Sequence, residues 1–168
     1  LTLGVDVDLP GAFTPRQVPA PAHTTSVDGY TVTLNGDLRP GATAKLTLTI
    51  SRDGTPVTDL QPYLGAYGHL VALRSGDLAY LHVHPDGEPG DGRTQPGPQV
   101  TFHAEVPSVG TYRLYLDFQH AGTVRTAEFT LTAAGVGGPA PGSPATHEPA
   151  GPATTTIDGH GDPGHGHD

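Results

Sequence analysis

Apolar and polar residues alternate with a period of two through most of the middle of this chain. Segments 30–36, 43–54 and 99–106 each carry large apolar side chains at every second position. This period is typical of a strand buried on one face, whereas an amphipathic helix repeats every 3.6 residues. Residues 27–132 contain no stretch with the helical period. We therefore predict an all-β domain over residues 27–132.

The alternation predicts seven strands, separated by turns rich in Gly, Pro and Asp. Their ranges are 30–36, 43–54, 69–74, 78–84, 99–106, 111–119 and 123–133. Seven short strands at intervals of about ten residues are the pattern of an immunoglobulin-like, Greek-key β-sandwich. A cupredoxin-like Greek key has a similar pattern and stays open as an alternative.

Two flanking segments lack this alternation. Residues 1–26 include a Pro-rich stretch and are predicted to form an N-terminal arm or linker. Residues 133–168 hold 9 Gly, 6 Pro and 4 His, with almost no large apolar side chains. Such a segment buries too little apolar surface to offset the entropy lost on ordering. We therefore predict a disordered C-terminal tail.

Composition excludes several classes of function. The 168 residues include 17 acidic and 8 basic side chains, for a net charge of -9. Nucleic acids and anionic membranes attract basic patches, so neither is expected as a partner. The absence of Cys excludes disulfides, thiolate catalysis and Cys-ligated metal sites. No run of 18 apolar residues is present, so we expect no membrane span in this chain.

The segment "YLHVHP" (80–85) suggests metal chemistry, because His82 and His84 would share one face of a strand. If the turn after Arg74 has an even number of residues, His69 pairs with His82 or His84. Three imidazoles then lie on one surface, which is a suitable ligand set for Cu(II) or Zn. Cu(II) is favoured by the general affinity order.

The other histidines are expected to have different roles. His103 is a fourth candidate ligand only if segment 99–106 neighbours the His82–His84 strand; otherwise it supports the site or is exposed. His120 is predicted to be a turn residue, and His23 lies in the arm with no specific role expected. The tail could bind metal without folding or act only as a solubilising segment; its histidines are His147, His160, His165 and His167.

No catalytic residues are predicted. The chain has no nucleophile-elbow, P-loop or dinucleotide-binding motif and no recognisable pair of acid–base carboxylates. The acidic loop 85–92 lacks the ligand spacing of a calcium loop. We therefore expect a protein that is not an enzyme.

Four segments carry a resemblance to a known family: "YLGAYGHLVAL" (63–73), "YLHVHP" (80–85), "VTFHAEVP" (100–107) and "YRLYLDFQHAG" (112–122). Together they resemble the YtkA-like domain of exported bacterial proteins, which often occurs alongside heavy-metal-handling components. The resemblance implies an immunoglobulin-like, extracytoplasmic domain. It implies metal association, with His69, His82 and His84 on the histidines of the motif. A membrane-bound or extracytoplasmic metal-handling protein is the implied partner.

Two other functions compete with metal binding. One is an immunoglobulin-like protein-interaction module that binds no metal. The other is a superoxide dismutase, since "HVH" in a Greek-key domain resembles the copper–zinc family. That family needs further spaced His ligands and a disulfide, whereas this chain has no Cys and no His in the long loop after His84.

Overall fold

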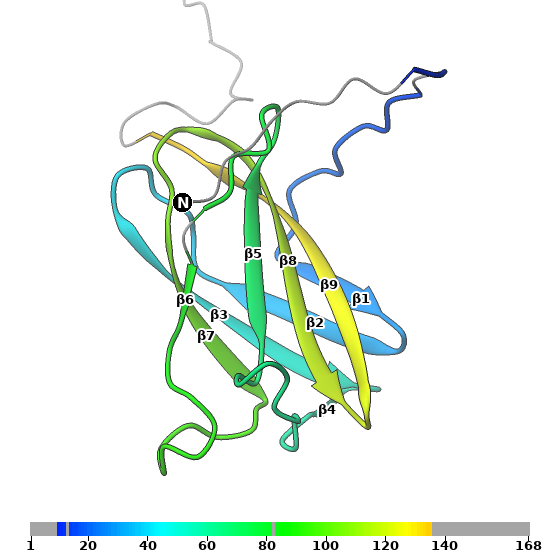
Figure 1. The fold of residues 1–168 in the computed structure, drawn as a ribbon, viewed down its shortest axis with the longest axis vertical. Coiled ribbons are helices and arrows are strands. Elements are labelled where there is room, and N and C mark those ends of the chain that lie inside the picture. Colours follow the sequence, from blue (N-terminus) through cyan, green and yellow to red (C-terminus); the bar gives the residue numbers. More distant parts are fainter. Residues whose placement is uncertain (1–9, 13, 82, 136–168) are drawn as a thin grey trace, which may run out of the picture. The chain divides into compact units, whose positions relative to one another are not determined.

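The computed structural model describes residues 10–12, 14–81 and 83–135, which form two antiparallel sheets and no helix (Figure 1). The larger sheet joins, in spatial order, β1 (Thr24–Val27), β2 (Tyr30–Asn35), β3 (Thr43–Arg52), β7 (Gln99–Glu105) and β6 (Val83–Pro85), while β4 (Thr55–Pro56) pairs with β3. The smaller sheet joins β5 (His69–Arg74), β8 (Gly110–His120) and β9 (Thr123–Ala133).

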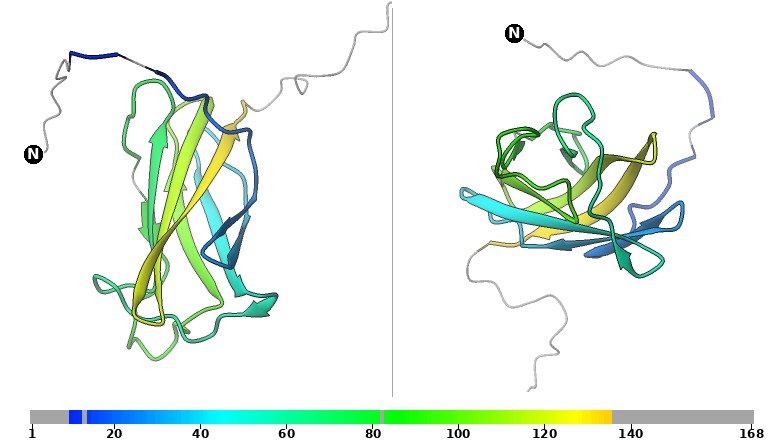
Figure 2. Two further views of the ribbon diagram at one scale, coloured as in Figure 1. Left: turned by 90° about the vertical axis from the view of Figure 1, so that its right-hand side faces the viewer. Right: turned by 90° about the horizontal axis from the view of Figure 1, so that it is seen from below.

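The two sheets face each other as two layers with one apolar core between them (Figure 2). Every second residue of the long strands points into this core, as the alternation predicted. The fully buried large side chains are Tyr30, Val32, Leu34, Leu46, Leu48, Ile50, Phe102, Tyr112, Leu114, Leu116, Phe118 and Phe129. Burying a side chain of this size stabilises the fold by about 1.5–3 kcal/mol relative to leaving it exposed.

Tight turns set the register of the hairpins. Asp53-Gly54, between β3 and β4, and Ala121-Gly122, between β8 and β9, have positive φ at both central residues. This is the conformation of a type I′ turn, whose twist matches that of the flanking strands. The turn predicted between the strands 111–119 and 123–133 is therefore confirmed, and with it the alignment of β8 with β9. β3 ends at Arg52, before the end of the predicted segment 43–54, because Asp53 and Gly54 form a turn.

The number of strands differs from the prediction of seven, since residues 10–12, 14–81 and 83–135 form nine. The additional strands are β1 and β4, which carry little apolar alternation because their residues are mostly exposed. β1 begins at Thr24, inside the segment predicted as an arm, and its pairing with β2 explains its order. At the other boundary, Ala133 is the buried last residue of β9 and does not belong to the tail. Residues 136–168 of the predicted tail lie outside the described residues.

No helix within the described ranges has the length and apolar character needed to cross a membrane.

Candidate functional site

His69 and His84 lie on neighbouring edge strands that belong to different sheets. His69 is the first residue of β5, at the edge of the smaller sheet, and His84 is the middle residue of β6, at the edge of the larger one. Figure 1 shows β5 and β6 next to each other. This open side of the sandwich therefore brings together two imidazole-bearing strands.

The turn between β5 and β6 determines how the two strands meet. Arg74 N–H donates to the Ala79 carbonyl at 3.0 Å, which closes a four-residue loop. Leu73 then pairs with Tyr80, and Leu81 N–H donates to the Ala72 carbonyl at 3.0 Å. An even-numbered loop is one of the predicted possibilities, and the pairing near the turn follows that register.

The predicted hairpin does not continue as a single ladder, which corrects the expectation that His69 and His84 share one sheet surface. After Leu81 the chain leaves the smaller sheet, and Val83 pairs with Ala104 of β7 in the larger one. The side chain of Leu81 is buried, and Val83 packs against the core. His69 and His84 therefore approach each other across an edge and not along a ladder.

An open pocket of about 430 Å³ lies between these edges. Both histidines line it, together with the turn before β5 and the start of the loop after β6. The lining residues are Leu64, Gly65, Ala66, His69, His84, Pro85, Gly87 and Glu88. We call this hollow the edge pocket.

A hydrogen bond orients the ring of His69. Its Nε2 lies 2.7 Å from the carbonyl oxygen of Tyr63, and the Tyr63 ring contacts the His69 ring edge-to-face at 5.8 Å between centroids. Because a carbonyl oxygen only accepts, Nε2 donates this hydrogen bond, and in the neutral ring Nδ1 is the nitrogen with the lone pair. Backbone hydrogen bonds of this kind fix the tautomer of metal-ligating histidines.

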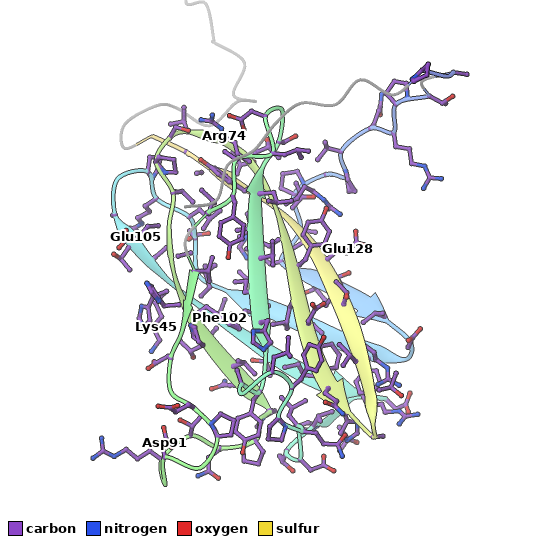
Figure 3. The ribbon with its side chains drawn as sticks, in the orientation of Figure 1. Lys45, Arg74, Asp91, Phe102, Glu105 and Glu128 are labelled. Carbon is purple, nitrogen blue, oxygen red and sulfur yellow. The ribbon has the colours of Figure 1, made fainter. Side chains whose placement is uncertain are left out.

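β7 pairs with β6, so segment 99–106 neighbours the strand of His84, as the prediction of His103 as a ligand requires. His103 lies directly opposite His84, and its Nε2 is 3.8 Å from Asp86 Oδ2. Lys45 of β3 flanks His103 on the other side. Figure 3 shows Lys45 projecting outward from the sheet, whereas Phe102, next to His103 in the chain, points between the layers. His103 is therefore on the outer face of the larger sheet.

The acidic loop after β6 is held in shape by Asp91, at its far end in Figure 3. Its carboxylate accepts hydrogen bonds from the Thr94 hydroxyl at 2.6 Å and from the backbone N–H groups of Thr94 and Arg93 at 2.7 Å. These hydrogen bonds, chiefly those from Thr94, hold the pKa of Asp91 well below its usual range. Asp91 is thus engaged within its own loop.

The described residues do not contain a complete metal site. Among residues 10–12, 14–81 and 83–135, no group of three or more His, Asp or Glu is arranged to hold an ion. His82 lies outside the described residues, as do the tail histidines. The sequence prediction for His82 therefore stays a prediction, and the geometry concerns His69, His84 and His103.

His120 has a structural position that sequence reasoning missed. The structure corrects its prediction as a turn residue: His120 is the last residue of β8, and its ring joins three segments of the chain. Nδ1 lies 2.7 Å from the hydroxyl of Tyr30 in the opposite sheet, and Nε2 lies 3.0 Å from the carboxylate of Asp59. No local sequence signal marks this contact, because Tyr30 is 90 residues away.

His23 also has a partner in the fold. Its Nδ1 lies 3.2 Å from the Leu34 carbonyl, beside the start of β1. The contact ties the end of the arm to β2. Neither His23 nor His120 lines the edge pocket.

Comparisons with known proteins identify a family but no activity. No curated protein matches the chain. Among solved structures, a DUF4426 family protein from Pseudomonas aeruginosa PAO1 is similar at 12% identity, with a TM-score of 0.42, over 66% of this chain and 96% of that one. A family model described as a domain of unknown function, DUF8832, matches residues 25–135, the segment that forms both sheets. The chain therefore belongs to the DUF8832 family.

Proposed function

We propose that this protein binds a divalent transition metal at the edge pocket, with His69 and His84 as ligands. The observation that carries the proposal is that two strands from different sheets each contribute an imidazole to one open pocket. Imidazole suits Cu(II) and Zn(II), and Cu(II) is favoured by the affinity order. The orientation of the His69 ring by the Tyr63 carbonyl supports coordination through Nδ1.

One further histidine completes the proposed ligand set, and another supports it. His82 is included because the alternation of "YLHVHP" predicts that it shares a face with His84. His103 is included as a supporting group, since it lies directly opposite His84. The carboxylate of Glu88, which also lines the pocket, adds favourable charge for a cation.

The strand order supports an immunoglobulin-like interpretation of the fold. The sequence β2-β3-β7-β6 in one sheet corresponds to strands A-B-E-D of that sandwich, and β5-β8-β9 in the other corresponds to C-F-G. With the sequence resemblance to exported YtkA-like domains, this suggests a non-enzymatic, extracytoplasmic protein. Its role would be to sequester copper or to deliver it to another metal-handling protein.

A protein-interaction module is the second candidate, and Leu64 is the observation that favours it. Leu64 is 78% exposed and has a positive φ of 48° at the rim of the edge pocket. A branched side chain in this conformation is strained, and such strain is often retained at functional positions. A partner that covers Leu64 would bind with or without metal, which separates the two candidates.

Calorimetric titration with Cu²⁺ tests the proposed function. The parent protein is the 168-residue chain with the four tail histidines replaced by Asn, so that only the sandwich is probed. We expect one saturable site per chain. Replacing both His69 and His84 by Gln should weaken affinity at least about tenfold, since each substitution removes a coordinating nitrogen.

A matched His23→Gln variant serves as the control and should keep the affinity of the parent. Binding should also weaken in acid, because only neutral imidazole coordinates a metal. Equal affinities of the parent and the double variant would refute the edge pocket as the site.

A further inference from the structure

A second group of side chains lies on the outer face of the larger sheet, next to the edge pocket. The pairing of β6 with β7 sets His84 opposite His103. Asp86 directly follows β6, and its N–H donates to the carbonyl oxygen of Thr101 at 2.9 Å. The chain therefore stays beside β7 for one residue beyond the strand, which brings Asp86 Oδ2 to 3.8 Å from His103 Nε2.

This group is accessible from solvent. The side chains of His103 and Asp86 are 41% and 56% exposed. Phe102 and Ala104, on either side of His103, are buried, so His103 is held facing outward. Asp86 and Glu88, in the loop after β6, add negative charge beside this group.

The ligand chemistry of the pair favours brief contact with an ion. One imidazole and one carboxylate are acceptable ligands for first-row divalent metals, but stable sites use three or four protein ligands. An ion held only by His103 and Asp86 would keep most of its water and exchange rapidly. His84 adjoins both places, because it lies opposite His103 and also lines the edge pocket with His69.

We propose that His103 and Asp86 form an outer capture point that passes a divalent metal ion to the edge pocket through His84. The transfer is a stepwise exchange of ligands, in which His84 binds the ion before His103 releases it. No electrons are transferred. This inference rests on the proposed function. It makes His103 and Asp86 transient ligands, distinct from the ligands that retain the metal.

Stopped-flow mixing with Cu²⁺ tests this inference. Tyrosine fluorescence reports binding, because the chain has 6 Tyr and no Trp, and the Tyr63 ring contacts that of His69. The protein is again the 168-residue chain with Asn at the four tail histidines. The test variants are His103→Gln and Asp86→Asn, and the controls are His23→Gln and Asp53→Asn.

A capture point speeds both the binding and the release of the metal ion. Its loss should therefore slow both processes without changing the equilibrium affinity. We expect association and dissociation rate constants to fall together by about threefold to tenfold in both test variants. The Kd should stay within about twofold of the parent value, and the controls should leave both rates unchanged.

Two results would overturn the inference while leaving the proposed function intact. A Kd at least about tenfold weaker for His103→Gln, with unchanged association, would make His103 an ordinary retaining ligand. Unchanged rates in both test variants would mean that the outer face plays no part in capture. By contrast, absence of saturable binding to the parent would refute the proposed function itself.

Discussion

At the residue scale, the histidines that the structure describes differ in what surrounds them rather than in how they appear in the sequence. Nε2 of His69 lies against the Tyr63 carbonyl, and Nδ1 is the nitrogen proposed to bind the metal. His120 has both ring nitrogens occupied, by Tyr30 and Asp59, and therefore links parts of the fold. Each of these histidines contacts a Tyr, but their roles differ. His69 is proposed to bind a metal, whereas His120 links parts of the fold.

Substituting Tyr30 by Phe tests the structural role of His120. The hydroxyl that contacts His120 Nδ1 would be lost, while the buried ring and its edge contact with Phe118 would remain. Leaving a partly buried imidazole nitrogen without its partner should lower the free energy of unfolding by about 1–3 kcal/mol.

Urea denaturation monitored by circular dichroism measures this change. Metal affinity should be unaffected, because Tyr30 does not line the edge pocket. Unchanged stability of the Phe variant would show that the hydrogen bond between the sheets contributes nothing.

At the element scale, alternation predicted which side chains are buried, but it did not predict which sheet each strand joins. The inward faces of the strands that contain Leu46, Phe102 and Leu114 are as expected. A strand that changes sheets keeps the same period of two on either side of the crossing. The passage from Leu81 to Val83 therefore carries no signal in the sequence, and the placement of His69 and His84 on different sheets could not be predicted.

The turn that aligns β5 with β6 leads to a prediction about acid titration. Asp77 accepts hydrogen bonds from the Arg74 guanidinium at two oxygens and from the Ala79 N–H at 3.2 Å. These contacts, chiefly the hydrogen bond from Arg74, lower the pKa of Asp77 to about 2. Carboxyl-detected NMR titration should give this value, and Arg74→Gln should return the pKa towards about 3.9.

The sign of the linked stability follows from the direction of the shift. Because the pKa of Asp77 is lower in the folded chain than in the unfolded one, the contact with Arg74 stabilises the fold above about pH 4. Its contribution is lost as the pH falls towards 2. An Asp77 pKa near 3.9 in the folded protein would contradict this description of the turn.

At the scale of the whole molecule, the sandwich can be predicted from local pattern, whereas the candidate site depends on contacts between distant segments. Tyr63, His69 and His84 meet at the open side of the two layers, and His103 lies beside His84 on the outer face of the larger sheet. The sequence indicated histidine clustering through "YLHVHP". It did not indicate that Asp86 adjoins His103, which results from the course of the chain beside β7.

The central claim is that His69 and His84, from different sheets, ligate one ion. Its most direct test is a crystal structure of the Zn²⁺-loaded protein with anomalous diffraction measured at the zinc edge. The account predicts an anomalous peak in the edge pocket, about 2.0–2.1 Å from His69 Nδ1 and from a ring nitrogen of His84. A zinc-saturated crystal with no anomalous density between β5 and β6 would contradict it.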